Sequence, residues 1–441
     1  MTNHVAALEE RLAETPELKA GIFGPSIRLS WPAFLASIPR IAAVLPPEPS
    51  QRRRVTARDP VAFLSLVLAT LYRGECVCLG APGPETLDAL VPDVAIGYQE
   101  SDIGVILRRC LGGEGPRLIF ATSGSTGGEK LVEKDWAALL AEAAWLSELF
   151  ARHGAGVGTL ALVPPWHLFG FLATFLVPLL RLESSHFALG SHGVWPVGDT
   201  QVPPLGTLVA VPALWPLVKS EGLSSAVPLV VTSGAALGRA REEELGRERR
   251  RGCRTRVIEL FGSTETGGIG WRECLVDEPA AYRCFPQVSL DVEGGLTHAR
   301  SPFTYPGNLR VTLADQLHVA ADGTRFLHAG RTDRVFKWNG SRYALGDIER
   351  VLSEVSGVER VQCFYLLDPD RPKGGELVAC LLGAKRDAKA VLKDYAMASS
   401  LPIPTRLYSV DTTHLSAMGK LAFAELRRID PYLSRYEPAA E

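Results

Sequence analysis

The chain has 441 residues, enough to bury a large core and to divide into two or more domains. With 46% hydrophobic residues, 22% charged residues and a formal net charge of −2, it is typical of a globular protein and offers nucleic acid no electrostatic footprint. Eight cysteines lack the density of a disulfide framework, and the N-terminus does not resemble a secretory signal, so we expect reduced thiols and a cytoplasmic location.

Helices and strands are expected to alternate in the first part of the chain. They are, in order, a helix over 5–14, a hairpin over 20–29, a helix from 31 towards 45, a strand at 55–56, a helix over 60–74, a strand over 76–79 and a helix over 84–90. Ser30 and Asp59 precede two of these helices and are typical capping residues. Such alternation predicts a mostly parallel sheet covered by helices.

The middle of the chain continues the same pattern. We expect a helix over about 134–152 and strands over 159–163, 203–212, 228–232 and 257–260. Residues 159–182 are apolar over a membrane-spanning length, but Pro164 and Pro165 interrupt them. A lone spanning helix would not tolerate that break, so we interpret the segment as a buried strand, a loop and a buried helix from about Phe169.

The C-terminal part is expected to form a small α+β unit. Its elements are a helix over 345–355, strands over 358–367 and 376–382, a helix over 387–397 and a strand over 406–410. The fold class is therefore α/β, with a large N-terminal domain of helix-covered sheets and a small C-terminal domain.

A Gly/Ser-rich loop follows the strand that ends with Leu118-Ile119-Phe120. Its residues 122–130 read TSGSTGGEK. Glycines allow backbone N–H groups to approach a ligand, hydroxyls add donors, and Lys130 adds positive charge, a combination that suits a polyphosphate. The G-x-x-x-x-G-K-[ST] spacing is absent. A flexible turn is the alternative interpretation.

Other strand ends also carry candidate side chains. Trp166 to Phe169 follow the strand over 159–163, where ligand sites in such sheets are found, although a packed core with one satisfied histidine is the equal alternative. The small residues 233–238 permit close approach of a flat ring. Glu265 lies in a Gly/Thr loop and is a candidate Mg²⁺ ligand, since Mg²⁺ prefers carboxylate and phosphate oxygens.

Taken together and in this order, these motifs resemble the adenylate-forming superfamily of acyl- and aryl-CoA ligases, peptide-synthetase adenylation domains and luciferases. The five matching motifs are TSGSTGGEK at 122–130, SGAAL at 233–237, FGSTE at 261–265, the ribose and hinge region formed by Asp315, Asp322-Gly323 and GRTDRVFKWNG at 330–340, and Gly419-Lys420. One such motif would be weak evidence, but five in order are specific.

The resemblance implies a nucleotide site. The phosphates of ATP would be held by Thr122, Ser123, Gly124, Ser125, Thr126, Gly127 and Lys130. The adenosine would be bound by Gly234, Ala235, Phe261, Gly262, Asp315 and Arg331, with Asp315 on the ribose hydroxyls. Thr264 would contact phosphate and Glu265 would bind Mg²⁺.

The resemblance also implies a moving domain and a two-step reaction. Asp333 would be the hinge between residues 1–332 and a lid of residues 333–441, and Lys420 on that lid would bridge the substrate carboxylate and ATP. A carboxylate attacks the α-phosphorus and pyrophosphate leaves, so positive charge from Lys420 and Mg²⁺ is needed where the anions meet. A thiol then attacks the acyl-adenylate, and a mobile lid serves both steps.

The acid is expected to be aromatic or otherwise apolar. The pocket would be bordered by Trp166, His167, Phe169, Gly267 and Ile269. Amino-acid-activating relatives generally place an aspartate near His167, and PPWHLFGF contains none. Short ligases of this kind occur beside carrier-protein pathways, so the phosphopantetheine of an acyl carrier protein is at least as good an acceptor candidate as CoA.

Three positions depart from the family pattern. Alternative functions therefore stay open. Glu129 stands where proline is usual, Ala314 where glycine is usual, and Phe423 where a basic residue is usual. None of them removes a predicted catalytic group. The rival interpretations are a non-catalytic relative that binds nucleotide or acyl-adenylate, an amino-acid-activating adenylation enzyme, and an unrelated phosphotransferase.

Overall fold

The structure of most of the chain is known from a computed structural model. It describes residues 2–15, 17–82, 101–112, 118–123, 129–188, 205–215, 218, 227–237, 239–274, 281–331, 334–338, 341–358, 360–367, 375–382, 387–411, 414–416 and 420–436. No helix within these ranges has both the length and the apolar character needed to cross a membrane.

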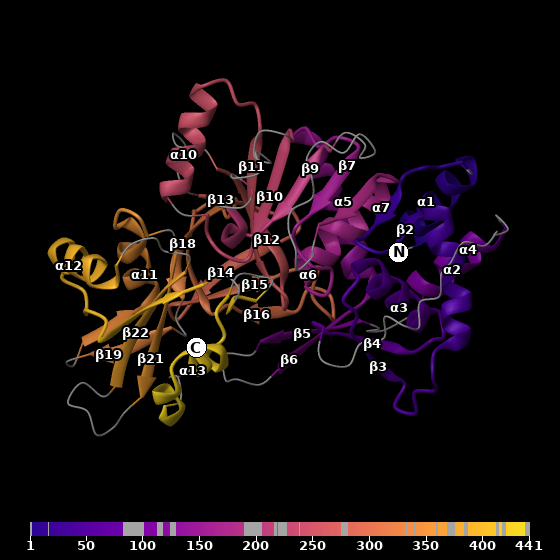
Figure 1. The fold of residues 1–441 in the computed structure, drawn as a ribbon. Coiled ribbons are helices and arrows are strands. Elements are labelled where there is room, and N and C mark those ends of the chain that lie inside the picture. Colours follow the sequence, from indigo (N-terminus) through magenta and orange to yellow (C-terminus); the bar gives the residue numbers. More distant parts are fainter. Residues whose placement is uncertain are drawn as a thin grey trace.

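The largest sheet has eleven strands and runs through the centre of the molecule (Figure 1). Its strands are β1 (Gly21–Phe23), β2 (Arg28–Ser30), β7 (Gly158–Ala161), β8 (Ser184–Phe187), β9 (Thr207–Ala210), β10 (Leu229–Ser233), β11 (Arg256–Ser263), β12 (Gly267–Glu273), β13 (Tyr282–Cys284), β17 (Asp315–Val319) and β18 (Arg325–Arg331). The order is β17-β18-β13-β12-β11-β10-β9-β7-β8-β1-β2. The run from β11 to β1 is parallel, and the strands that flank it are antiparallel.

Two smaller sheets accompany it in the same part of the chain. One consists of β3 (Arg52–Val55), β4 (Cys76–Leu79), β5 (Leu118–Ser123) and β6 (Glu129–Lys134), in that order. The other consists of β14 (Ser289–Glu293), β15 (Leu296–Arg300) and β16 (Arg310–Thr312). Strands β5 and β6 pair in antiparallel fashion, with Ser123 opposite Glu129.

Helices connect these strands. They are α1 (Thr2–Glu14), α2 (Trp31–Val44), α3 (Pro60–Tyr72), α4 (Ser101–Leu111), α5 (Trp136–Arg152), α6 (Leu168–Gly170), α7 (Val177–Arg181) and α10 (Arg239–Arg250), with a π-helical stretch over Phe171–Leu176 and a 3₁₀ turn over Pro212–Leu214. Side chains cap three of them: Ser30 accepts from the N–H of Ala33, Asp59 from that of Val61, and Asp135 from that of Ala138.

The remainder of the chain forms a separate set of elements. It contains β19 (Val335–Trp338) paired with β20 (Ser341–Ala344), the sheet β21 (Val361–Leu367), β22 (Gly375–Leu382) and β23 (Arg406–Val410), the helices α11 (Leu345–Glu354), α12 (Ala388–Ala398) and α13 (Phe423–Ile429), and a 3₁₀ turn over Pro431–Arg435. Lys420 lies in the loop before α13.

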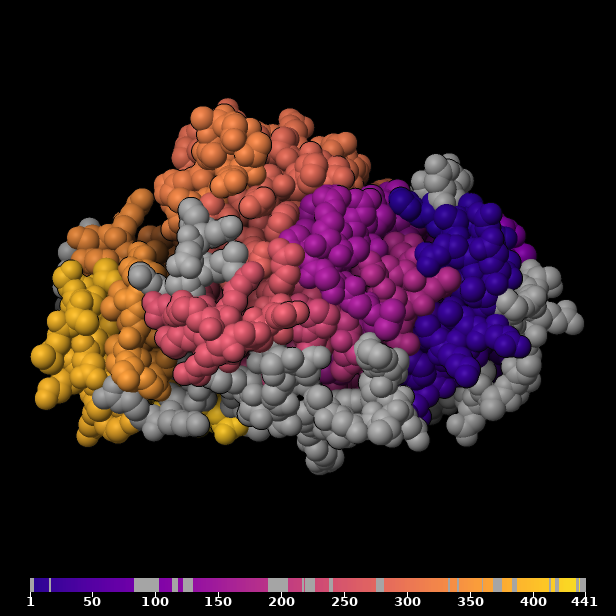
Figure 2. Space-filling view, turned by 90° about the horizontal axis from the view of Figure 1, so that it is seen from above, coloured from indigo at the N-terminus to yellow at the C-terminus, as the bar shows by residue number. Residues whose placement is uncertain are grey.

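The hydrophobic clusters also divide between the N-terminal and the C-terminal sets of elements. Two hydrophobic clusters use residues up to Phe326, and two others use residues from Phe336 onward. The orange and yellow C-terminal elements lie at one end of the molecule and the indigo N-terminal elements at the other (Figures 1 and 2).

The expected α/β fold is confirmed, and three local expectations are corrected. Lys134 ends strand β6 and does not begin the following helix, which starts at Trp136 after its cap. Strand β11 extends through Ser263, because residues 261–263 pair with β12. Strand β8, helix α4 and strands β12 to β18 were not expected from the sequence. The helix expected over 84–90 lies outside the described residues.

Two glycines allow a close backbone crossing in the large domain. A Cβ on Gly206 would lie 2.0 Å from the backbone nitrogen of Gly156. Because backbone cannot move aside as a flexible side chain can, we expect Gly206→Ala to destabilise the fold by about 2 kcal/mol or more. Gly346→Ala is the matched control, since its Cβ would meet nothing within 4 Å. Urea unfolding of both variants checks this, and equal midpoints would contradict it.

Candidate active site

Lys130 on β6 and Glu265, which follows β11, form an ion pair. The Nζ atom of Lys130 lies 2.5 Å from Oε1 of Glu265, although 135 residues separate them in the chain. Burial raises the pKa of Glu265, but hydrogen bonds and the charge of Lys130 outweigh this, and the net pKa is lowered. The carboxylate is therefore ionised at neutral pH, as a ligand for Mg²⁺ has to be.

The loop that joins β5 to β6 is only partly described. Thr122 and Ser123 end β5, and Thr122 pairs with Lys130 across the hairpin. The residues Gly124, Ser125, Thr126 and Gly127 lie outside the described residues, and so do the side chains of Thr122 and Ser123. Their expected roles in phosphate binding stay predictions.

A hairpin of β11 and β12 carries the next group of candidate residues. Gly262 is opposite Gly268, and a Cβ on Gly262 would lie 2.3 Å from the carbonyl oxygen of Gly267. Gly267 has φ +70°, a value that favours glycine. The partly exposed Thr264 and Glu265 lie in the turn between the strands, and the buried Thr266 hydroxyl donates to the carbonyl of Gly267. The turn is therefore built from residues with little freedom to move.

The expected adenine side lies at the ends of the parallel strands β10 and β11. Gly234 has φ +91°, and both Gly234 and Ala235 are exposed. The half-buried ring of Phe261 lies 5.3 Å from the His328 ring and 5.3 Å from the Phe326 ring. An open backbone segment thus lies at the same edge of the sheet as an aromatic side chain, an arrangement suited to a flat base.

A polar group adjoins that aromatic ring. Oδ1 of Asp315 on β17 lies 2.7 Å from Nε2 of His328, and Oδ2 lies 3.7 Å from Nη1 of Arg331. Asp315 and Arg331 are directly paired between β17 and β18. His328 was not among the residues expected from the sequence; its only signal is its place on the strand that carries Arg331.

The residues expected to border the acid occupy different depths. Trp166 is 8% exposed and meets Phe63 edge-on at 5.7 Å, and Ile269 is 1% exposed in the main core. Phe169 is half-buried, and Gly267 is buried. His167 comes directly before α6, with its side chain making no capping hydrogen bond.

Lys420 acts electrostatically on His167. Burial, and after it the positive charge of Lys420, lowers the pKa of His167 to about 4, so the ring is neutral at pH 7. Lys420 is exposed, and its loop is closed by the hydrogen bond from the N–H of Ser416 to the carbonyl of Lys420, 2.8 Å long. The charge of Lys420, from the C-terminal part of the chain, is therefore felt at His167. The expected hinge, Asp333, lies outside the described residues.

A buried lysine and a buried glutamate lie beneath the hairpin turn, and neither was expected from the sequence. Lys134 is 0% exposed, and its Nζ atom donates to the carbonyl oxygens of Phe303, at 2.5 Å, and Glu265, at 3.3 Å. Glu142 on α5 is 4% exposed and accepts from the N–H of Gly268 at 2.7 Å. Burial raises the pKa of Glu142 to about 7, against the opposing charge of Lys134.

This pKa predicts how stability depends on pH. Between pH 4.5 and 7 the folded protein binds more protons at Glu142 than the unfolded chain, so its contribution falls as pH rises through that window. Glu142→Gln should therefore gain stability relative to the parent between pH 5 and 8, by up to about 3 kcal/mol. Glu148→Gln on the exposed side of α5 is the control. Urea unfolding at each pH checks this; a pH-independent difference would contradict it.

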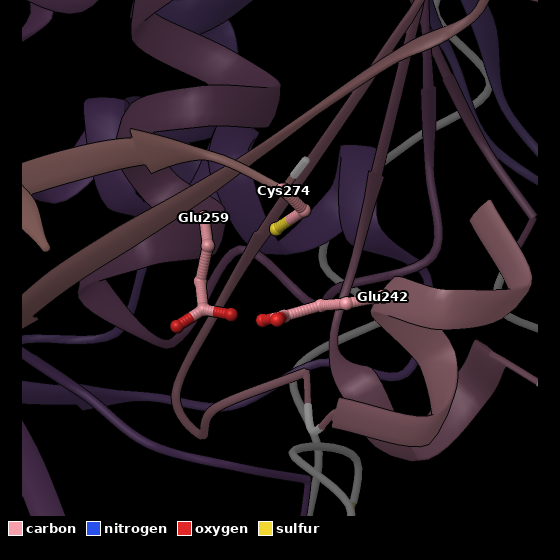
Figure 3. Close-up of side chains that lie close together, drawn as sticks. All are labelled: Glu242, Glu259 and Cys274. Carbon is pink, nitrogen blue, oxygen red and sulfur yellow. The ribbon is translucent and has the colours of Figure 1, made fainter. Parts of the chain in front are cut away.

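Glu242, Glu259 and Cys274 lie close together and could be mistaken for a metal site (Figure 3). The Nη2 atom of Arg272 lies 2.5 Å from Oε1 of Glu242 and 3.1 Å from Oε2 of Glu259, so a guanidinium neutralises both carboxylates. The Tyr282 hydroxyl also donates to Glu259. We therefore interpret this cluster as an ion-pair network inside the fold, in which Arg272 supplies the positive charge.

The sequence of this chain is similar to those of AMP-binding enzymes. A family model described as "AMP-binding enzyme" matches residues 101–311. A 4-coumarate–CoA ligase of Rhodobacter capsulatus is 30% identical over 300 residues, which cover 66% of this chain and 71% of that protein. A 4-coumarate–CoA ligase of Cereibacter sphaeroides is 31% identical over 330 residues, covering 69% and 70%.

A solved structure agrees over nearly the whole length. The o-succinylbenzoate–CoA synthetase MenE of Bacillus subtilis, solved with ATP and magnesium, superposes with a TM-score of 0.68 at 14% identity and covers 94% of this chain and 98% of its own. At that identity the likeness concerns the fold alone.

Proposed function

This chain belongs to the AMP-binding enzymes, as an AMP-forming acid–thiol ligase, and from that membership we propose its substrates: ATP, an aromatic or other apolar carboxylic acid, and the thiol of CoA. The observation that supports this most is the position of Lys420. This lysine from the C-terminal unit lies close enough to His167 to lower the pKa of that ring.

The nucleotide is proposed to lie between the Gly/Ser-rich loop and the ends of β10 and β11. Lys130 and the loop backbone would bind the phosphates, and Phe261 would pack against adenine. Asp315, held by His328 and Arg331, would accept from the ribose hydroxyls. Glu265 would hold Mg²⁺, which supplies positive charge to the phosphates when bound.

The first step joins the acid to AMP. A carboxylate oxygen of the acid forms a bond to the α-phosphorus of ATP, the bond from that phosphorus to the bridging oxygen breaks, and pyrophosphate leaves. Lys420 neutralises charge where the two anions meet. In the second step the CoA sulfur bonds to the acyl carbon, AMP leaves with the carboxylate oxygen, and the thiol proton passes to water.

The C-terminal unit is proposed to rotate between these steps. Its hydrophobic clusters begin at Phe336, separate from those that end at Phe326. We propose residues 1–332 and 333–441 as the two domains, with Asp333 as the pivot, so that Lys420 withdraws when the thiol enters.

The acid and the acceptor follow from the chemistry of the site and from the relatives. Trp166 and Phe169 offer apolar and aromatic surface, and neutral His167 offers a hydrogen-bonding group without charge, an environment that favours aryl or other apolar acids over amino acids. The relatives named as CoA ligases favour CoA over an acyl carrier protein.

A coupled assay tests both choices. The purified protein is given ATP, Mg²⁺ and a panel of aryl, aliphatic and amino acids, and AMP, pyrophosphate and thioester are measured with CoA or with a phosphopantetheinylated carrier protein as acceptor. We expect AMP and an aryl-CoA thioester. Loading of the carrier protein without a CoA thioester would overturn the choice of acceptor, and turnover of amino acids alone would overturn the choice of acid.

A further inference from the structure

The turn between β11 and β12 presents backbone groups to the protein interior. The carbonyl of Glu265 accepts from Lys134, and the N–H of Gly268 donates to Glu142, so both groups find partners in buried side chains. Buried backbone groups need such partners, because leaving one unsatisfied is costly. The partners come from β6 and α5, the elements that follow the Gly/Ser-rich loop in the chain.

Lys134 joins two segments to the loop hairpin. Its ammonium donates to the carbonyls of Glu265 and Phe303, two positions far from each other and from Lys134 in the chain. An ammonium has three donors and can serve both carbonyls at once. Lys134 therefore fixes the backbone of Glu265, while Lys130, four residues earlier, binds the side chain of the same residue.

Glu142 holds the other end of the turn. Its Oε1 atom accepts from the N–H of Gly268, and a Cβ on Gly267 would lie 2.6 Å from its Oε2 atom. The same Cβ would lie 2.6 Å from the Cβ of Phe303. The turn is thus packed between a carboxylate and the segment that Lys134 binds, without space to shift.

We propose that Lys134 and Glu142 are positioning residues for adenylation, which hold the Glu265–Gly268 turn so that its carboxylate and its glycines keep a fixed place beside the nucleotide and the acid. The inference rests on the proposed function, because Glu265 is the proposed Mg²⁺ ligand and Gly267 a proposed neighbour of the acid. It goes further by assigning a role in this reaction to two residues that do not touch either substrate.

Two substitutions at Glu142 separate positioning from general stability. Glu142→Gln keeps the length of the side chain and an oxygen that accepts from Gly268, but loses the charge. Glu142→Asp keeps the charge but is one methylene shorter, so it withdraws the acceptor. If the hydrogen bond to the turn is what matters, the glutamine variant stays within about twofold of the parent in kcat and the aspartate variant loses about tenfold or more.

The measurements are kcat and KM for pyrophosphate release, the half-saturating Mg²⁺ concentration, and hydrogen exchange of the amides in 261–271 by mass spectrometry. For Glu142→Asp we expect lower kcat, higher half-saturating Mg²⁺ and faster exchange in that segment. Lys134→Met, which removes both donations, is expected to change the same three quantities in the same direction.

Glu75 provides a matched control. It is 3% exposed, lies before β4, and is ion-paired with Arg53 and with Arg73, each at 2.9 Å. Glu75→Asp should lower the unfolding temperature without changing half-saturating Mg²⁺ or the exchange of 261–271.

Two results would overturn the proposal. One is Glu142→Asp with parental kcat, Mg²⁺ dependence and exchange. The other is a loss in both Glu142 variants, and in Glu75→Asp, that simply follows the drop in unfolding temperature. If the parent turned over no acid in the panel, the proposed function would fail, yet the exchange of 261–271 would still decide whether these residues hold the turn.

Discussion

Replacing Lys420 by alanine is expected to lower the rate of acyl-adenylate formation by about 10²–10³-fold, the loss found when one preorganised donor to a developing anion is removed. The physical reason is that a carboxylate and a polyphosphate repel each other as the new bond forms. Stopped-flow or quenched measurement of pyrophosphate release checks it. Thioester formation from a supplied acyl-adenylate should change much less, because the charge problem belongs to the first step.

Two further observations guard that prediction. Lys389→Ala changes an exposed lysine on α12 of the same C-terminal unit and should leave both steps intact. In Lys420→Ala the pKa of His167 should rise from about 4, because one of its two causes is removed, and this can be followed by NMR of the imidazole ring. Full adenylation activity in Lys420→Ala would contradict the assigned role.

Replacing Arg272 by methionine is expected to destabilise the large domain by about 3–5 kcal/mol, because it leaves buried carboxylates without their counter-charge. Arg272 is 8% exposed and neutralises both Glu242 and Glu259, of which Glu259 is 1% exposed. Removing one member of a buried pair costs more than the pair itself contributes, since the remaining charge has lost its water and its partner.

A second substitution tests that explanation. Adding Glu259→Gln to Arg272→Met should restore part of the lost stability, because the uncompensated charge is removed. Arg249→Met, which breaks an exposed ion pair with Glu273 at 3.3 Å, should cost under about 1 kcal/mol. Urea unfolding of the three variants provides the comparison. A loss below about 1 kcal/mol for Arg272→Met would show that its ion pairs with Glu242 and Glu259 contribute little to stability.

Local chemistry was enough to predict where two helices, α2 and α3, begin. Ser30 and Asp59 were expected as caps, and their side chains accept the hydrogen bonds that caps accept. The alternation of strands and helices likewise predicted the α/β class, because that pattern depends on residues near one another in the chain. In the C-terminal part, α11, α12 and β21 to β23 were expected on the same grounds, whereas β19, β20 and α13 were not.

Long-range pairing explains the errors. From the sequence, Glu129 and Lys130 were expected to end the Gly/Ser-rich loop and Lys134 to begin a helix. Residues 129–134 instead pair with β5 and so form a strand. Phe261 to Ser263 read as loop because glycine and serine are frequent there, yet β12 returns to pair with them. Nothing in the local sequence specifies either partner, so periodicity alone could not have predicted these strands.

The site shows the same division. Lys130 was expected to bind the phosphates of ATP and Glu265 to bind Mg²⁺. The structure brings their side chains together at 2.5 Å. Lys134 and Glu142 were missed because a lone lysine or glutamate in a helical or strand pattern normally faces water. Their contacts depend on the packing of α5 beneath the β11–β12 turn, which only the tertiary structure specifies.

The hairpin of β11 and β12 has a consequence for engineering. Phe261 to Glu265, which are proposed for the nucleotide side, and Gly267 with Ile269, which are proposed for the acid side, belong to one antiparallel hairpin. Because β12 is hydrogen-bonded to β11, a change that displaces β12 to admit a bulkier acid is expected to displace β11 as well. Selectivity for the acid is better redesigned at Trp166–Phe169, because this segment lies between β7 and α6 and does not belong to the β11–β12 hairpin.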